Sequence, residues 1–266
     1  MLNKPTPRRL TSIERIYGHK GLEAFKNTSV LIAGVGGVGS WCVEALARSG
    51  IGRIVMVDMD HVAESNINRQ VHALDTTLGM SKISALKDRI TLIQQDCEVV
   101  LVDNFVTSEN VKDITTTYKP DIFIDCIDDA RAKVAIALTC ADQDLHLIMA
   151  GGAGGKTDIF SIHTSDLAQV QNDNLLKRVR DLLRKEHGYP SSSEFYRSQP
   201  MGITTVWFKQ KAMMPSLWSN PSDGPNTPQG LSCAGYGSLV TVTGTMGFAL
   251  AQLALNHIIT KHNIII

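Results

Sequence analysis

Four glycines stand immediately after a short apolar run. Gly34, Gly36 and Gly39 have the spacing GxGxxG, and Gly37 is an extra glycine between them. Glycine lets backbone amides approach a phosphate closely, and the N-terminus of a following helix adds a positive dipole there. Asp58 comes 24 positions after Gly34, where a carboxylate that binds ribose hydroxyls is expected. The motif therefore predicts a nucleotide site, and both NAD and ATP suit it.

A polar segment with two cations follows this acid. Its polar positions include Asp60, Asn66, Arg69, Gln70 and Lys82. When a carboxylate attacks the α-phosphate of ATP, charge builds on the departing pyrophosphate, and Arg69 and Lys82 can neutralise it. Asn66 and Gln70 can orient phosphate oxygens without adding charge. A dehydrogenase has no need of these cations, so the segment favours nucleotidyl transfer.

A second group of acids ends a later apolar run. The sequence Asp125-Cys126-Ile127-Asp128-Asp129 lies where a buried strand should finish, which is the usual place for ligand residues in an open sheet. One of these acids could hold Mg²⁺ near the phosphates. A solvated polar loop would explain any one of these residues, but all of them in order favour a site.

Alternating elements must position these residues. Strands are expected at 29–33, 53–58, 98–103, 121–125 and 145–150, and helices at 8–27, 40–49, 82–95, 109–116 and 130–142. This alternation predicts an α/β, doubly wound, Rossmann-like and mainly parallel sheet with N-terminal helices.

The pattern changes after Ala150. A glycine-rich turn at 151–155 precedes a basic amphipathic helix at 175–187, a loop-rich stretch at 188–222 and an uncharged helix at 239–260. Polar side chains in that last helix favour a buried helix over a membrane span. We expect one domain over 1–266, with a helical arm at 1–27, a nucleotide-binding core at 28–150 and an elaborated C-terminal third at 151–266.

Composition excludes several classes of protein. The 26 Lys and Arg balance the 26 Asp and Glu, which argues against a wholly electrostatic nucleic-acid binder. An apolar share of 43% excludes a disordered chain.

The five cysteines contain no CxxC pair, so no zinc site is expected. Since the sequence also shows no secretory signal, these cysteines indicate the reducing cytoplasm. Cys42, Cys126 and Cys140 are expected in the core; for Cys233, both a structural and a reactive role stay open.

Several of these motifs together resemble a known superfamily. Gly34–Gly39, Val57–Asp60, Ser65–Gln70, Gly79–Lys82 and Asp125–Asp128 resemble the adenylation core of the ubiquitin-activating enzymes. Within that superfamily, Arg15–Gly18, Gly152–Gly155 and the stretch around Cys233 resemble the tRNA threonylcarbamoyladenosine dehydratase family. The resemblance is continuous over about 8–185, departs at 186–230 and returns at 231–260.

The resemblance implies an enzyme that uses ATP and Mg²⁺ to adenylate the threonyl carboxylate of threonylcarbamoyladenosine beside the anticodon of tRNA. Ring closure then yields the cyclic, dehydrated nucleoside. By motif, Asp58 would bind ribose, Asn66, Arg69 and Lys82 the phosphates, and Asp128 the magnesium. Arg15 would cross to the ATP of a second subunit, which implies a homodimer.

The resemblance also raises a monovalent cation, Na⁺ or K⁺, near Gly151–Gly155. Whether a sulfur-relay protein docks on the chain stays open, and no membrane partner is expected.

One positively charged helix and several aromatic side chains have two interpretations. The helix at 175–187 carries Lys177, Arg178, Arg180, Arg184, Lys185 and His187, diluted by Asp181 and Glu186. A contact to the tRNA backbone and a merely solvated face are equally compatible with it. The aromatic residues that could stack an extruded base are Tyr189, Phe195, Tyr196, Trp207 and Phe208. The histidines that flank the phosphate loop, His61 and His72, are expected to have surface or core roles.

Three other functions compete with the dehydratase. An adenylyltransferase would activate the C-terminal glycine of a ubiquitin-like or sulfur-carrier protein, but the missing CxxC pairs and the absence of cysteine between Cys140 and Cys233 count against it. A NAD-dependent oxidoreductase would have no use for Lys82. A non-catalytic nucleotide-binding scaffold would not need Arg69, Lys82 and Asp128 together.

Overall fold

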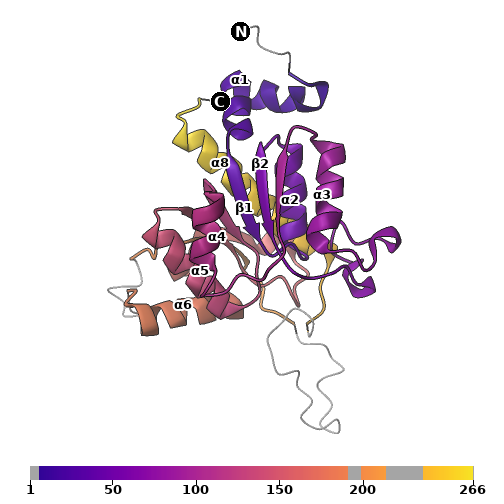
Figure 1. Ribbon diagram of the computed structural model, residues 1–266. Coiled ribbons are helices and arrows are strands. Elements are labelled where there is room, and N and C mark those ends of the chain that lie inside the picture. Colours follow the sequence, from indigo (N-terminus) through magenta and orange to yellow (C-terminus); the bar gives the residue numbers. More distant parts are fainter. Residues whose placement is uncertain (1–5, 191–198, 214–235, 266) are drawn as a thin grey trace.

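A seven-stranded sheet forms the centre of the molecule in the computed structural model, which describes residues 6–190, 199–213 and 236–265 (Figure 1). The strand order is β3-β2-β1-β4-β5-β7-β6. All neighbours are parallel except β6 and β7. The strands are β1 (Ser29–Ala33), β2 (Arg53–Val57), β3 (Glu98–Val102), β4 (Ile122–Asp125), β5 (His146–Ala150), β6 (Ile162–Asp166) and β7 (Thr204–Phe208). The predicted Rossmann-like, mainly parallel sheet is confirmed.

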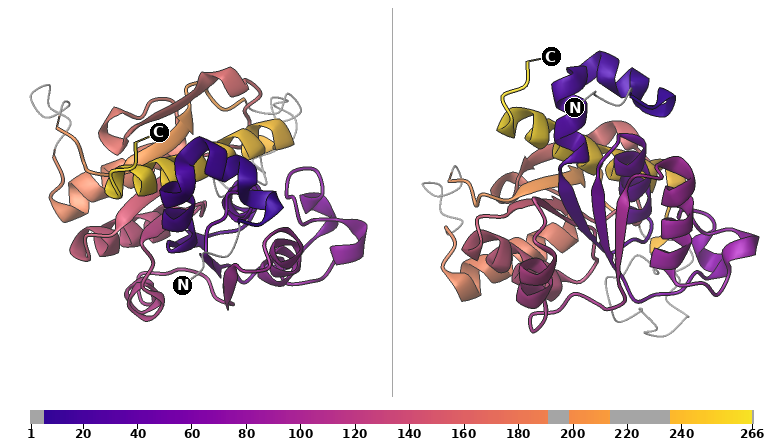
Figure 2. Two further views of the ribbon diagram at one scale, coloured as in Figure 1. Left: turned by 90° about the horizontal axis from the view of Figure 1, so that it is seen from above. Right: turned by 45° about the horizontal axis from the view of Figure 1, so that its top comes forward.

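Helices cover both faces of this sheet (Figures 1 and 2). On one side lie α1 (Thr11–Lys26), α2 (Gly39–Arg48), α3 (Lys82–Ile93) and α8 (Val240–Lys261), and on the other α4 (Val111–Tyr118), α5 (Ala130–Asp142) and α6 (Asn174–His187). Each face of the sheet packs on its own hydrophobic core. Every residue of β1 is buried, because Val30 and Ile32 face the core on the α2 side and Leu31 and Ala33 face the core on the α5 side. A strand covered on both faces reads as a continuous apolar run rather than an alternating one.

Two strands correct the expectation for the C-terminal third. The stretch 188–222, expected to be loop-rich, contains β7, and β6 was not expected at all. β7 is inserted between β5 and β6, and its pairing of Thr204 with Ile148 joins residues far apart in the sequence. β6 is a polar edge strand that is only partly buried, so it lacks the apolar signal of the inner strands.

The C-terminal helix α8 belongs to the core. Its polar side chains had predicted a buried helix rather than a membrane span. It is long and apolar enough to cross a membrane, but 61% of its most apolar window is buried inside the fold. It runs along α2, and its Gly247 makes the close approach possible, because a Cβ there would lie 2.6 Å from the carbonyl oxygen of Val38. α8 therefore supports the helix that begins at the glycine-rich turn.

Candidate nucleotide-binding site

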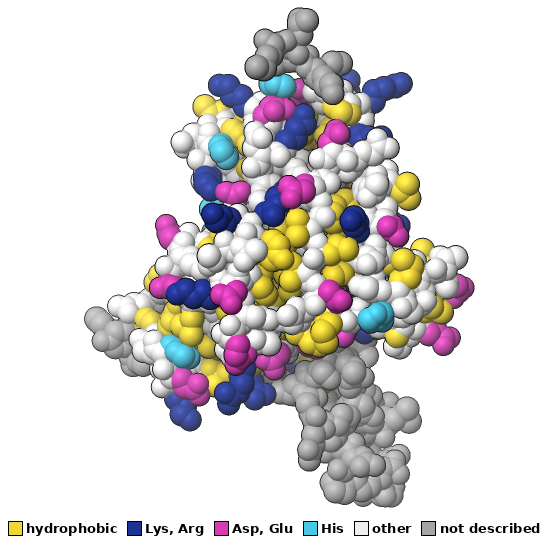
Figure 3. Space-filling model, in the orientation of Figure 1, with side chains coloured by type: hydrophobic (Ala, Val, Ile, Leu, Met, Phe, Trp, Pro, Cys, Tyr) yellow, Lys and Arg dark blue, Asp and Glu magenta, His cyan; other side chains and the backbone are white. Residues whose placement is uncertain are grey.

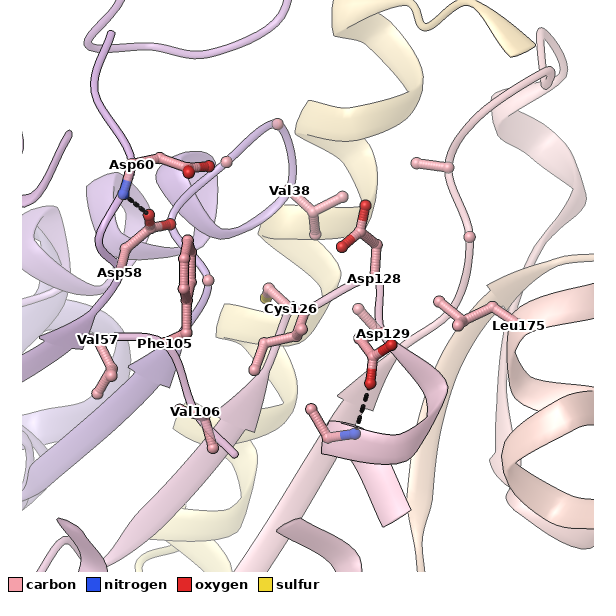
Figure 4. Close-up of a pocket in the computed structure, with 18 of the residues that line it drawn as sticks. Val38, Val57, Asp58, Asp60, Phe105, Val106, Cys126, Asp128, Asp129 and Leu175 are labelled. Atoms are coloured by element: carbon pink, nitrogen blue, oxygen red, sulfur yellow. Dashed lines mark hydrogen bonds between the residues drawn. The ribbon is translucent and has the colours of Figure 1, made fainter. Parts of the chain in front are cut away.

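A cavity of about 610 Å³ opens at the carboxyl ends of the central strands. Figure 4 shows its acidic side chains on opposite walls, with Asp58 and Asp60 on one side and Asp128 on the other. The chain winds from β1 toward β3 in one direction and from β4 toward β5 in the other, so the cavity lies where the winding reverses. Ligands of open α/β sheets bind at this point.

The glycine-rich turn forms the floor of the cavity, and its glycines have different roles. Gly34 has a positive φ of +80°, a conformation that favours glycine. A Cβ on Gly39 would lie 1.9 Å from the carbonyl oxygen of Gly34, whereas a Cβ on Gly36 would meet only the Gln70 amide at 3.8 Å. Gly34, Gly36 and Gly37 line the cavity and Gly39 does not. Gly39 has a packing role here, and the predicted contact of its backbone with a ligand stays a prediction.

Asp58 lies directly after β2 and is held by two backbone amides. Its Oδ2 accepts the N–H of Val35 at 2.8 Å, and its Oδ1 accepts the N–H of Asp60 at 2.9 Å. Burial raises the pKa of this carboxyl, although the two amide donors act in the opposite direction. Each oxygen of an ionised carboxylate keeps a further acceptor site. The side chain is thus fixed in place and can still receive ribose hydroxyls.

Lys82 is directed to the cavity by Asp60. The Nζ of Lys82 donates to Asp60 Oδ2 at 2.7 Å, and its backbone N–H donates to the Asp60 carbonyl at 3.0 Å. Only 8% of the lysine side chain is exposed, whereas Asp60 is 53% exposed. An ammonium has three donors, so two remain for a ligand such as a phosphate.

Arg69 and Asn66 lie on the loop between β2 and α3, and both line the cavity. The guanidinium of Arg69 donates to the Ser65 carbonyl at 2.7 Å and to Asn68 Oδ1 at 3.0 Å. Asn66 Oδ1 accepts the N–H of Ala63, which leaves its amide hydrogens available. These local bonds give both side chains a defined orientation before any ligand binds.

Gln70 carries an orphaned acceptor. Its side chain is buried and lines the cavity, and its Oε1 has no hydrogen-bond partner among the described residues. A buried acceptor without a partner costs about 1–3 kcal/mol. A ligand group that donates a hydrogen bond to this oxygen would remove this cost.

Asp128 faces the cavity from the loop after β4. Its carboxylate is exposed and makes no hydrogen bond or ion pair with another described residue. Beneath it, Asp125 and Lys133 form a fully buried ion pair at 3.1 Å, and Asp125 Oδ1 also accepts the N–H of Ile127. Burial raises the pKa of Asp125, and the Lys133 ammonium opposes that shift. The buried pair anchors the loop that presents Asp128.

Several lining residues had not been predicted. The segment after β3 contributes Phe105, Val106, Thr107 and Ser108, and α5 contributes Arg131. Phe105 is 46% exposed and lies beside Asp58 in Figure 4, where an aromatic ring suits a nucleobase. The position of this segment just after β3 could have predicted its place in the site, because all parallel strands end at this edge of the sheet.

Arg15 does not line the cavity of its own chain. It is an exposed residue of α1, which leads into the amino end of β1 and so lies at the opposite end of the sheet (Figure 1).

The expected base-stacking side chains are mostly elsewhere. Trp207 and Phe208 are buried in the two cores, which excludes them from stacking and corrects that expectation. Tyr189 is half-buried and lines a separate cavity with His146 and His257. Phe195 and Tyr196 lie outside the described residues.

Cysteines and histidines mostly follow expectation. Cys42 and Cys140 are buried, and Cys126 is half-buried, because it packs against the core and also lines the cavity. Burial raises the pKa of the Cys126 thiol to about 12, so it is unreactive as a thiolate. His61 is exposed and His72 is buried. Cys233 lies outside the described residues.

The sequence profile of the ThiF family matches residues 8–265. The chain belongs to the ThiF family. Among its relatives, the tRNA threonylcarbamoyladenosine dehydratase of Haemophilus influenzae is 34% identical over 95% of this chain and 94% of that protein. That of Escherichia coli is 36% identical over 93% and 92%. The solved structure of the E. coli dehydratase TcdA in complex with ATP has a TM-score of 0.83 at 34% identity and covers 96% of this chain and 95% of that chain. The predicted resemblance is confirmed.

Proposed function

We propose that this chain is an ATP-dependent tRNA threonylcarbamoyladenosine dehydratase. The observation that carries the proposal is the match of the whole ThiF-family chain to an ATP-bound dehydratase, combined with a cavity lined by the predicted nucleotide motifs. We propose that the chain acts as one adenylating unit, with residues 151–266 adding the substrate and dimer contacts.

The nucleotide is proposed to lie along the floor and one wall of the cavity. Its phosphates would contact the backbone amides of the glycine-rich turn at the start of α2. Asp58 would accept the ribose hydroxyls, and Phe105 would face the base. The amide N–H groups of Asn66 and Gln70 would donate to the phosphate chain, and Gln70 Nε2 lies 3.8 Å from where a Cβ on Gly36 would stand.

Two cations serve the first chemical step. The substrate carboxylate attacks the α-phosphate, an acyl-adenylate forms, and pyrophosphate leaves. Arg69 and Lys82 neutralise the charge that develops on the leaving group, and both are already oriented by hydrogen bonds. Such preorganised charge needs little rearrangement during the reaction.

The second step is ring closure. The nucleophile lies in the same molecule as the activated carbonyl carbon, so binding supplies proximity without a second substrate. Its bond to the carbonyl carbon forms as the bond to AMP breaks. The nucleoside loses the elements of one water, which appear in AMP and pyrophosphate.

Magnesium is proposed at Asp128. Mg²⁺ takes one or two carboxylates together with waters and substrate phosphates. The exposed Asp128 carboxylate, which is unpaired among the described residues and faces the cavity, fits this demand. When bound, the ion supplies positive charge to the phosphate chain.

A monovalent cation, Na⁺ or K⁺, near Gly151–Gly155 remains part of the proposal. Next to this segment, the buried Nζ of Lys156 donates hydrogen bonds to the carbonyls of Phe208 and Gln210 at 3.1 and 3.0 Å, and Asp173 lies 4.0 Å away. Lys156 therefore already supplies one positive charge beside this segment.

A cytoplasmic homodimer is part of the proposal. Exposed apolar side chains gather on two segments, with Ile67, Leu74 and Leu78 on one and Leu239, Val240 and Phe248 on the other. The bond from Asn68 to the Ser238 carbonyl holds these segments together. Such a patch suits a subunit contact. In the proposed homodimer, Arg15 would reach the partner's ATP. A sulfur-relay protein is a further candidate partner, which co-purification would test.

Mass spectrometry of nucleosides tests the function. Threonylcarbamoyladenosine-bearing tRNA is incubated with the protein, with and without ATP and magnesium. We expect a loss of one water from that nucleoside only when ATP is present. An unchanged nucleoside, together with ATP–pyrophosphate exchange that requires a carrier protein ending in glycine, would instead establish the adenylyltransferase alternative.

A further inference from the structure

The cationic side chains of the basic helix α6 point in two directions, inward and toward solvent. Arg180 and Arg184 face inward, since Arg180 donates to the carbonyls of Leu167, Ala168 and Val170 and Arg184 donates to that of Pro190. Lys177, Arg178 and Lys185 are exposed. Part of the charge on α6 is thus structural, and only the exposed part is available to a partner.

The exposed cations form one stripe. Lys177, Arg178 and Lys185 line the same shallow hollow, together with Asn174, Asp181 and Leu182. None of the three cations takes part in an ion pair among the described residues, although Asp181 lies four positions from both lysines. In Figure 3, dark blue side chains lie along the lower left margin, where Figure 1 places α6.

The stripe is connected to the nucleotide cavity. A smaller cavity of about 50 Å³ shares Asp128, Gly152 and Leu175 with the nucleotide cavity, and it shares Asn174 with the hollow on α6. Hollowed surface therefore continues from the proposed reacting centre at Asp128 to the basic stripe.

Asp173 fixes α6 against this centre. Its Oδ1 caps the helix by accepting the N–H of Leu176, and its Oδ2 accepts the N–H of Gly152. Because Gly152 lines the nucleotide cavity, a partner held on α6 has a defined position relative to bound ATP.

We propose that Lys177, Arg178 and Lys185 bind the phosphate backbone of the tRNA substrate next to the modified nucleoside. This inference rests on the proposed function. From Lys177 to Lys185 the helix rises about 12 Å, which spans several phosphates of one strand. The net charge of the stripe is positive even with Asp181, and such contacts position a nucleic acid without reading its sequence.

The test compares two doubly substituted proteins with the same change in net charge. The test variant carries Lys177→Glu and Lys185→Glu. The control carries Lys87→Glu and Lys119→Glu, two exposed lysines on other elements that are also in no ion pair among the described residues. Thermal unfolding of both verifies that they fold.

Binding of unmodified tRNA transcript is titrated over a series of salt concentrations, and turnover is measured with threonylcarbamoyladenosine-bearing tRNA. We expect the test variant to raise Kd and KM for tRNA about ten-fold, and to reduce the slope of log Kd against log salt by about 1.4. The kcat at saturating tRNA and the Kd for ATP should equal those of the unsubstituted protein. The control should change none of these values.

The outcomes separate the two claims. If the unsubstituted protein dehydrates the nucleoside but the test variant keeps its KM and salt slope, the α6 surface is wrong and the proposed function stands. If the unsubstituted protein binds tRNA without dehydrating the nucleoside, the proposed function fails, and the binding titration still decides whether α6 is the surface. Absence of any tRNA binding would overturn both.

Discussion

At the scale of single residues, the site contains charges that are held in place by neighbours of the same chain. Lys82 is directed by Asp60, and Arg69 by its own loop. Asp128 differs, because no described residue binds its carboxylate. The residues proposed to stabilise a leaving group are therefore fixed, whereas the one proposed to bind a metal is open to it.

Substitution of Lys82 tests the role of this fixed charge. We expect Lys82→Ala to lower kcat about 10²–10³-fold, the usual loss when one preorganised charge-stabilising group is removed. Asp60 stays exposed and solvated in this variant, so the fold should persist. The matched control is Lys87→Ala, an exposed lysine on the same helix. A rate within a few-fold of normal for Lys82→Ala would remove the lysine from the mechanism.

At the scale of elements, the glycine-rich turn separates packing from binding. Gly39→Ala places a methyl group 1.9 Å from the Gly34 carbonyl, so the turn must shift. We expect this variant to lose about 1–3 kcal/mol of unfolding free energy, measured by urea denaturation.

Gly36→Ala should behave in the opposite way. Its methyl group would point into open space near Gln70, so stability should stay within about 0.5 kcal/mol of normal. ATP affinity should fall, because the methyl group lies where the phosphates approach. Equal stability losses in the two variants would contradict the division of roles between these glycines.

Local sequence could predict only the parts of the site that consecutive residues build. The turn at Gly34–Gly39 and the acid after β2 follow from the order strand, glycine, helix, strand. Phe105 could have been predicted from its place just after β3, but the start of α8 could not, because its approach depends on how distant segments pack. β7 was missed for the same reason, since it pairs with β5 across more than fifty intervening residues.

At the scale of the whole molecule, the proposed homodimer would make the active site a property of two chains, because Arg15 is proposed to reach the ATP of the partner subunit. Mixing Arg15→Ala protein with Lys82→Ala protein should restore activity, because a mixed dimer keeps one cavity with Lys82 that faces a partner with Arg15. Random exchange would give about a quarter of normal activity. Mass spectrometry of intact dimers verifies exchange. No rescue among verified mixed dimers would place Arg15 outside the reaction.

The stability of the whole fold should depend on pH through His72. Burial, followed by the charges of Lys82 and Arg89, lowers the pKa of His72 to about 4, and neither ring nitrogen has a partner among the described residues. An unfolded histidine titrates near pH 6.5. As pH falls from about 6.5 to about 4, His72 binds a proton in the unfolded chain but stays neutral in the folded chain. This group should therefore lower the unfolding free energy by about 1.4 kcal/mol per pH unit.

Denaturation at several pH values checks this dependence. Between pH 6.5 and 5 the His72→Phe variant should lose less stability than the unsubstituted protein. A His61→Phe variant, altered at an exposed histidine of the same loop, serves as the control. Identical pH dependence in all three proteins would show that His72 is not the group responsible.

The packing of α8 has a consequence for how the protein is made. Thr243 of α8 donates to the carbonyl of Arg69 at 3.4 Å, and Gly247 packs on the residue that precedes α2. Domains generally fold as units during synthesis. A nascent chain that has emerged only as far as β7 lacks the helix that backs the phosphate loop. We therefore expect the nucleotide site to be completed only after α8 has emerged from the ribosome.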